Sequence, residues 1–170
     1  RDALGKAASL RTVPPRKEYR GRSDGYIENY EIERMHVVYH VRSTWRANWK
    51  TGVDAFYETY HLPWVHPQTE RVMEDLSQYD LYATGASRMI VPICVKSHRV
   101  SDQESLDAYL KFMLKEAGVD PEGFRGSARE VRAAVQRAER ERARRVGLRH
   151  YDRFTDGQLT DSWATGLFPN

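Results

Sequence analysis

Two histidines and two carboxylates fall within thirteen consecutive positions of this sequence, from Asp54 to His66. Neutral imidazole is a good ligand for divalent iron, zinc or copper, so His61 and His66 together supply half of a metal site. Glu58 lies three residues before His61, on the same face if the segment is helical. A third, anionic ligand would complete a facial triad with open positions for oxygen. The alternative is a polar helix end whose histidines cap backbone carbonyls.

The position of His66 depends on where the helix before it ends. Apolar residues at three- and four-residue spacing predict an amphipathic helix through Trp49, Val53, Phe56, Tyr57 and Tyr60. Pro63 removes a backbone donor and restricts the residue before it, so we expect this helix to end near His61 or Leu62. The chain can then turn and bring His66 back toward His61.

The rest of the chain predicts the elements that must position this segment. Alternating or continuous apolar runs predict strands over residues 33–41, 79–84, 88–95 and 162–168. The middle two strands would be joined by a turn at Gly85-Ala86. Helical spacing predicts two further helices, over residues 105–117 and 127–146, the second ending at Gly147. This order of elements favours an α+β fold with a mainly antiparallel sheet.

The composition of the chain excludes several classes of protein. The 170 residues suffice for one domain with a hydrophobic core. Cys94 is the single cysteine, which excludes an internal disulfide and a multi-cysteine metal cage, and favours a reducing, cytoplasmic setting. No apolar run is long enough to span a membrane, and the N-terminus lacks the apolar stretch of a secretory signal.

The basic residues are concentrated between Arg125 and Arg153, in a chain with a formal net charge of +3. Acidic residues such as Glu139 and Glu141 are interleaved with them at helical spacing. The pattern therefore predicts a solvated helix face with many ion pairs rather than a track for phosphates. We expect neither nucleic acid nor a membrane as a partner.

Two motifs together carry a family resemblance. The first is Asn48-Trp49-Lys50 followed by Asp54-x3-Glu58-x2-His61-x4-His66-Pro67, and the second runs from Gly147 to Asp161 and leads into Leu167-Phe168-Pro169-Asn170. The first resembles the mononuclear iron segment of Rieske-type non-haem iron oxygenases, in the catalytic domain of the large (alpha) subunit of ring-hydroxylating oxygenases. The second resembles the stretch that opens the later sheet strands of that domain.

The resemblance implies a role for each matched residue. His61 and His66 would be ligands of a mononuclear Fe(II), and the third ligand, an aspartate in the family, would follow Asn170. Glu58 matches the bridging carboxylate, which links an iron-ligating histidine to a histidine of the Rieske cluster in the neighbouring subunit and so provides the electron path. Asp54 matches an acidic position close behind these ligands.

The resemblance also implies a fold and a domain arrangement. The family fold is the helix-grip (START/Bet v 1-like) type, an antiparallel sheet around a long helix, and it would be incomplete in this chain. Residues 1–30 would be a linker that follows an absent Rieske domain, and residues 31–170 a partial catalytic domain. The [2Fe-2S] cluster would belong to that absent domain, because one cysteine cannot hold it. Such a fragment is expected to bind iron weakly and to be inactive alone.

The implied reaction is hydroxylation of a small apolar, aromatic substrate with O2. Electrons would come from a ferredoxin or a reductase, and the assembly would be a homotrimer or an alpha3beta3 hetero-hexamer. Six apolar residues are candidates for the substrate pocket, with ordinary core packing as the alternative for each: Tyr60, Leu62, Trp64, Met89, Ile90 and Phe112.

Two other functions compete with this interpretation. One is a helix-grip protein that binds a hydrophobic ligand and has no redox activity. The other is a di-iron carboxylate protein, because Glu33-x-x-His36 is a second pair of the Glu58-x-x-His61 kind. A di-iron site needs such pairs on the helices of a four-helix bundle, so the strand-like alternation of residues 33–41 argues against the second. The same alternation places His36 and His40 toward solvent.

The remaining chemistry-bearing residues are expected to be uninvolved. His98 and His150 lie among charged residues without ligand-like neighbours in the sequence, and Cys94 is expected to be a small buried residue in an apolar strand.

Overall fold

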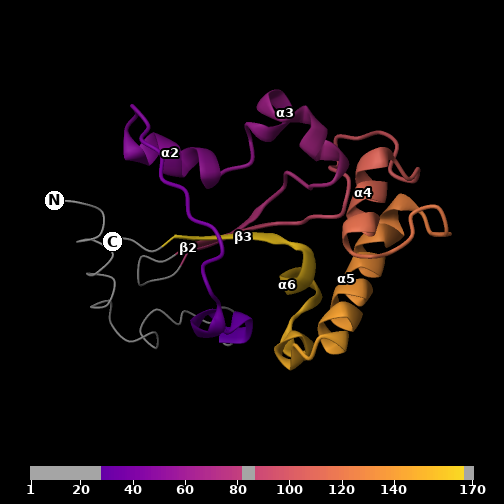
Figure 1. Cartoon of the computed structure of the whole chain (residues 1–170). Helices are drawn as coiled ribbons and strands as arrows, with labels where there is room; N and C mark the ends of the chain where they lie inside the picture. The colour runs from indigo at the N-terminus through magenta and orange to yellow at the C-terminus, as the bar shows by residue number, and fades with distance from the viewer. Residues whose placement is uncertain (1–27, 82–86, 167–170) are drawn as a thin grey trace.

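The computed structural model describes residues 28–81 and 87–166 (Figure 1). Its elements, with η for 3-10 helices, are η2 (Glu28–Tyr30), η3 (Ile32–Arg34), α2 (Trp49–Phe56), α3 (Leu62–Val65), η4 (Pro67–Arg71), β1 (Gln78–Leu81), β2 (Ser87–Val91), α4 (Ala108–Glu116), α5 (Ala128–Arg145), η5 (Arg149–Arg153), α6 (Asp156–Thr160) and β3 (Ser162–Gly166). Among the described helices, none combines the length and apolarity needed to cross a membrane.

Three strands form an antiparallel sheet in the order β1-β2-β3. Met89 in the central strand pairs with Tyr79 on one side and with Ala164 on the other. Met89 and Val91 alternate along β2, so both side chains point to the same, buried face of the sheet. In Figure 1 the sheet crosses the middle of the molecule and α4 and α5 lie at one end of it.

The main hydrophobic cluster of the described residues lies between α4 and α5. Leu110 and Leu114 of α4 and Val131 of α5 are fully buried, and Cys94 packs into the same cluster. Small residues of α5, such as Ala134, let the two helices approach closely. This helix pair therefore holds the largest described group of buried apolar side chains.

Local capping signals define both helices of this pair. The Asp107 carboxylate accepts hydrogen bonds from two backbone amides at the start of α4. A capping box between Ser127 and Glu130 begins α5. Gly147, just past α5, adopts a φ of +79°, the left-handed conformation in which glycine commonly ends a helix.

The mixed α+β class and the antiparallel sheet agree with the expectation from sequence. The two helices predicted over residues 105–117 and 127–146 correspond to α4 and α5, within three residues at each end. The strand predicted over 88–95 is shorter and ends at Val91, because Pro92 cannot donate to the sheet. Cys94 consequently lies outside the strand, with a φ of +62°.

The strand predicted over residues 33–41 is wrong. This stretch contains the end of η3 and then an irregular, exposed segment, in which Val38 is 96% exposed. An alternating pattern forms a half-buried strand only when a neighbouring strand and an apolar surface are present to pair with it. Within the described ranges, neither is present beside this segment.

The helix predicted to reach His61 ends earlier, at Phe56. Pro63 does not stop it. Pro63 instead lies in the first turn of the separate four-residue helix α3, where proline is tolerated because its missing N–H would have no partner there. The predicted linker over residues 1–30 falls almost wholly outside the described residues, as do the turn at Gly85-Ala86 and residues 167–170.

The core position of Leu110 gives a first testable prediction. Leu110→Ala should lower the free energy of unfolding by about 2–5 kcal/mol, because it leaves a cavity between α4 and α5. Leu81→Ala is the matched control, since Leu81 is exposed on β1, and should change stability by less than about 0.5 kcal/mol. Urea unfolding of the full-length protein measures both, and equal effects would contradict this assignment of the core.

Candidate metal centre

Glu58 and His61 lie in the connection between α2 and α3, not on a helix. One Glu58 oxygen contacts the ring nitrogen Nδ1 of His61, and the other accepts a hydrogen bond from the His61 backbone N–H at 3.1 Å. Both side chains are largely buried, at 16% and 24% exposure. An ionised carboxylate only accepts hydrogen bonds, so Nδ1 carries the proton and the lone pair of a neutral His61 is on Nε2.

His61 and His66 bracket α3 as its N- and C-terminal flanking residues. The His66 backbone departs from helical angles, with φ −129° and ψ 55°, and its carbonyl accepts hydrogen bonds from the backbone and side chain of Thr69. A continued helix would direct residues five apart to different sides. With this departure the two imidazole rings lie 5.6 Å apart between centroids, at 75° to each other.

This spacing suits two ligands of one ion. With a metal–nitrogen distance of about 2.1 Å and a ligand angle of roughly 90–120°, two imidazoles on one ion have centroids about 4.5–5.6 Å apart, and the observed 5.6 Å is at the upper end of this range. The carboxylate on Nδ1 of His61 is also the usual outer partner of a metal-bound histidine, which it orients and makes more basic. The donor set of His61 and His66 therefore fits divalent iron, with Glu58 behind it.

Asp54 does not join this group. It lies exposed on α2, and its carboxylate has no hydrogen-bond or ion-pair partner among residues 28–81 and 87–166.

The six residues predicted to line a substrate pocket are dispersed. Tyr60, Trp64 and Phe112 are exposed, Met89 is buried in the sheet, and Leu62 and Ile90 are partly buried. Their role stays a prediction.

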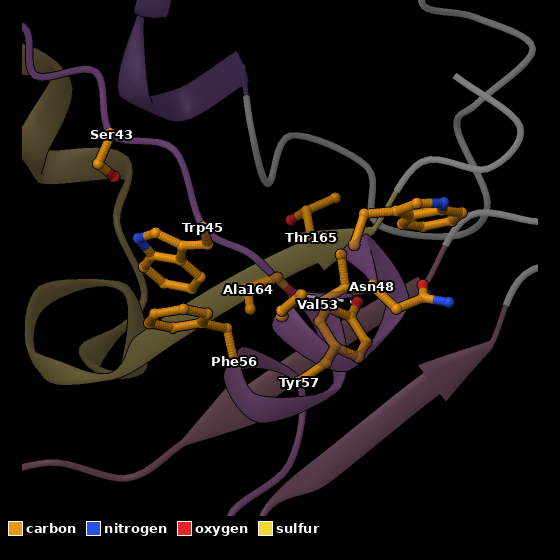
Figure 2. Close-up of a pocket in the computed structure, with 11 residues that line it drawn as sticks. Ser43, Trp45, Asn48, Val53, Phe56, Tyr57, Ala164 and Thr165 are labelled. Carbon is orange, nitrogen blue, oxygen red and sulfur yellow. Dashed lines mark hydrogen bonds between the residues drawn. The ribbon is translucent and has the colours of Figure 1, made fainter.

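An apolar groove of about 590 Å³ lies between α2 and β3 (Figure 2). None of the six predicted pocket residues lines it. The rings of Trp45 and Phe56 stack at 6.3 Å along one side of it. Val53 and Tyr57 continue the lining along α2, and Ala164 belongs to β3. The sequence signal for this groove is the apolar stripe of α2, whose Trp49, Val53 and Phe56 line it opposite Ala164 and Thr165 of β3.

Three metal-type side chains do come within 4.8 Å of one another elsewhere, namely Glu74, Asp75 and His98. The expectation that His98 has no ligand-like neighbours is therefore wrong. Glu74 precedes His98 by 24 residues, so their contact leaves no local pattern in the sequence. His98 Nδ1 donates to Glu74 at 2.8 Å, and the His98 backbone N–H donates to the other Glu74 oxygen.

This cluster is an ion-pair network rather than a metal site. The Asp75 carboxylate accepts from Ser97 Oγ at 2.6 Å and from Arg99 Nε at 2.7 Å. All four carboxylate oxygens of Glu74 and Asp75 are thus engaged by protein donors, and Arg99 supplies the positive charge. Burial by itself would raise the pKa of Asp75, but the hydrogen bonds from Ser97 and Arg99 outweigh burial and lower that pKa to about 2.

The remaining candidates stay apart from both clusters. Glu33 and His36 are exposed, in η3 and just after it, so they do not form the helical pair that a di-iron site needs. His40 is exposed, and His150 packs against Tyr151. Burial raises the pKa of the Cys94 thiol to about 11, which keeps it protonated and unreactive at neutral pH.

Comparison with known proteins gives one match. The family model described as "Ring hydroxylating alpha subunit (catalytic domain)" matches residues 32–170. Searches of curated proteins and of solved structures give no significant match. The matched range contains Glu58, His61 and His66 as well as the whole sheet.

The lowered pKa of Asp75 predicts a pH-dependent stability. The carboxylate should stabilise the fold fully above about pH 4 and lose this effect as the pH falls toward 2, because the folded pKa lies below the unfolded one. Asp75→Asn should cost about 1.5–3 kcal/mol at neutral pH, and the cost should shrink over that acid range. Urea unfolding at several pH values tests this, with Asp54→Asn as the control. Parallel pH profiles for wild type and Asp75→Asn would contradict it.

Proposed function

Because the chain belongs to the family of ring-hydroxylating alpha subunits, as their catalytic domain, we propose that it is the iron-binding part of a Rieske-type oxygenase. In this proposal His61 and His66 hold a mononuclear Fe(II), and the substrate is a small apolar, aromatic molecule. The observation that carries it is the Glu58 carboxylate on Nδ1 of His61, with the His66 ring 5.6 Å from that of His61.

When bound, the iron would supply O2 activation beside the substrate. The protein residues around the iron would orient its ligands and hold the ligand protons in place. Glu58 keeps the proton of His61 on Nδ1 and fixes the plane of the ring, which leaves Nε2 free for the ion. Its two oxygens also retain lone pairs for a further donor. We propose that this donor is a histidine of the Rieske cluster in a neighbouring subunit, so that Glu58 lies on the electron path.

The finer parts of the proposal rest on the family alone. The third ligand would be an aspartate that follows Asn170, and Asp54 would act close behind the ligands. The sheet and α5 would belong to an incomplete helix-grip fold, preceded by a domain with the [2Fe-2S] cluster. Electrons would come from a ferredoxin or reductase in a cytoplasmic trimer or alpha3beta3 hexamer.

The groove beside α2, lined mainly by apolar side chains, favours the alternative of a hydrophobic-ligand-binding protein without redox activity.

The two ligand assignments predict loss of iron on substitution. His61→Ala and His66→Ala should each lower the iron retained after anaerobic reconstitution of the full-length protein by at least tenfold, because each removes one donor. His40→Ala, at an exposed histidine away from the site, should bind as wild type does. Metal analysis after gel filtration measures this. A wild-type protein that takes up no iron would favour the ligand-binding alternative.

The Glu58 assignment predicts a different outcome. Glu58→Gln should retain iron but slow the reoxidation of the dithionite-reduced Rieske cluster by O2 about 10–100-fold, since the amide can no longer accept from two imidazoles with both oxygens. Visible absorbance of the cluster in the full-length assembly follows the rate. Glu141→Gln, exposed on α5, is the matched control. Unchanged reoxidation in Glu58→Gln would remove Glu58 from the electron path.

A further inference from the structure

The residues on either side of Glu58 each tie the chain to a different part of the fold through a hydroxyl group. We propose that Tyr57 and Thr59 are positioning residues that together fix the Glu58 carboxylate against His61. This inference rests on the proposed function, because it assigns the two hydroxyls to the geometry of that same site. Neither residue is singled out by the sequence motif.

The Tyr57 hydroxyl is bound to both β2 and β3. The Gly166 backbone N–H donates to it at 3.0 Å, and it donates to the Ala164 carbonyl at 3.3 Å. The Ser87 hydroxyl lies 2.9 Å away. A phenol hydroxyl has one proton and two lone pairs, so one donated and two accepted bonds satisfy it completely, with Ser87 as the second donor. Figure 2 shows Tyr57 leaving α2 toward Ala164 of β3.

Gly166 permits this close approach. A Cβ built at residue 166 would lie 2.7 Å from Ser87 Oγ and 3.2 Å from the Tyr57 hydroxyl oxygen. Any larger residue would therefore push Ser87 and Tyr57 away from the edge of β3. The space at Gly166 and the hydroxyl of Tyr57 are complementary parts of one contact between α2 and the sheet.

The Thr59 hydroxyl makes the second attachment. It is buried, at 7% exposure, and donates to the Asp75 backbone carbonyl at 2.7 Å while Ser77 Oγ donates to it. The Asp75 carboxylate is in turn held by Ser97 and Arg99. The ion-pair network around Asp75 thus supports the segment that receives Thr59.

These two attachments leave Glu58 little freedom. Consecutive Cα atoms are about 3.8 Å apart, so residue 58 cannot move far while both neighbours are fixed. The carboxylate must meet two donors of His61 at once, and its remaining lone pairs must face an incoming donor. Loss of either hydroxyl should leave His61 and His66 able to bind iron but let the bridging carboxylate move.

The test uses Tyr57→Phe and Thr59→Val in the full-length protein, with Thr59→Ser as the conservative rescue. Tyr109→Phe and Thr51→Val, both at exposed helix positions, are the controls. We expect full iron content and an unchanged near-UV spectrum in both variants. Reoxidation of the reduced Rieske cluster by O2 should slow about tenfold in each and recover in Thr59→Ser. The electron paramagnetic resonance spectrum of the iron with nitric oxide as probe should shift from that of wild type.

A double-mutant cycle separates positioning from general stability. If Tyr57 acts through Glu58, adding Tyr57→Phe to Glu58→Gln should slow reoxidation little further. Equal slowing with and without Glu58, or variants that match the controls, would overturn the inference while leaving the iron site intact. Failure of the proposed function is distinguishable, because wild type itself would then bind no iron or would not depend on His61 and His66.

Discussion

The candidate site depends on one pair of contacts, in which a single carboxylate binds both the backbone N–H and the ring Nδ1 of the same histidine. Glu58 binds the ring and the backbone amide of His61 at once, which is possible because the two residues lie in a turn between two short helices. On a continuous helix the His61 amide would donate to the Tyr57 carbonyl instead. The end of α2 at Phe56 therefore frees the amide that Glu58 uses, and the departure of His66 from helical angles brings the second ring near.

The sequence predicts the parts of the fold that are set by local signals. The limits of α4 and α5 follow from an N-terminal aspartate, a capping box and a C-terminal glycine, and these act within a few residues. The sequence also predicts that the chain turns and brings His66 back toward His61, and the two rings lie 5.6 Å apart. Pro63, however, lies inside α3 rather than after a longer helix.

What the sequence misses depends on partners far along the chain. Residues 33–41 have the alternation of a strand but no strand beside them in the described part of the molecule, so the pattern alone misleads. The network of Glu74, Asp75 and His98 joins residues more than twenty positions apart, and the attachment of Tyr57 to Gly166 spans 109 positions.

The arginines of α5 also have partners that no local pattern predicts. Arg132 reaches Asp161 and the Ile93 carbonyl, and Arg140 reaches three acceptors between Tyr151 and Asp156, so these arginines connect α5 to the segments around it.

The hydrogen bonds around Glu58 and Thr59 have a consequence for how the proposed iron site would be filled. In many small metal-binding domains the ion itself drives folding, since the ligands are scattered until it arrives. Here two side-chain contacts hold the turn that carries His61. The Glu58 carboxylate binds the His61 ring, and the Thr59 hydroxyl donates to the Asp75 carbonyl. A chelator should therefore strip the ion reversibly and leave a folded apoprotein, so that loading and release proceed without refolding.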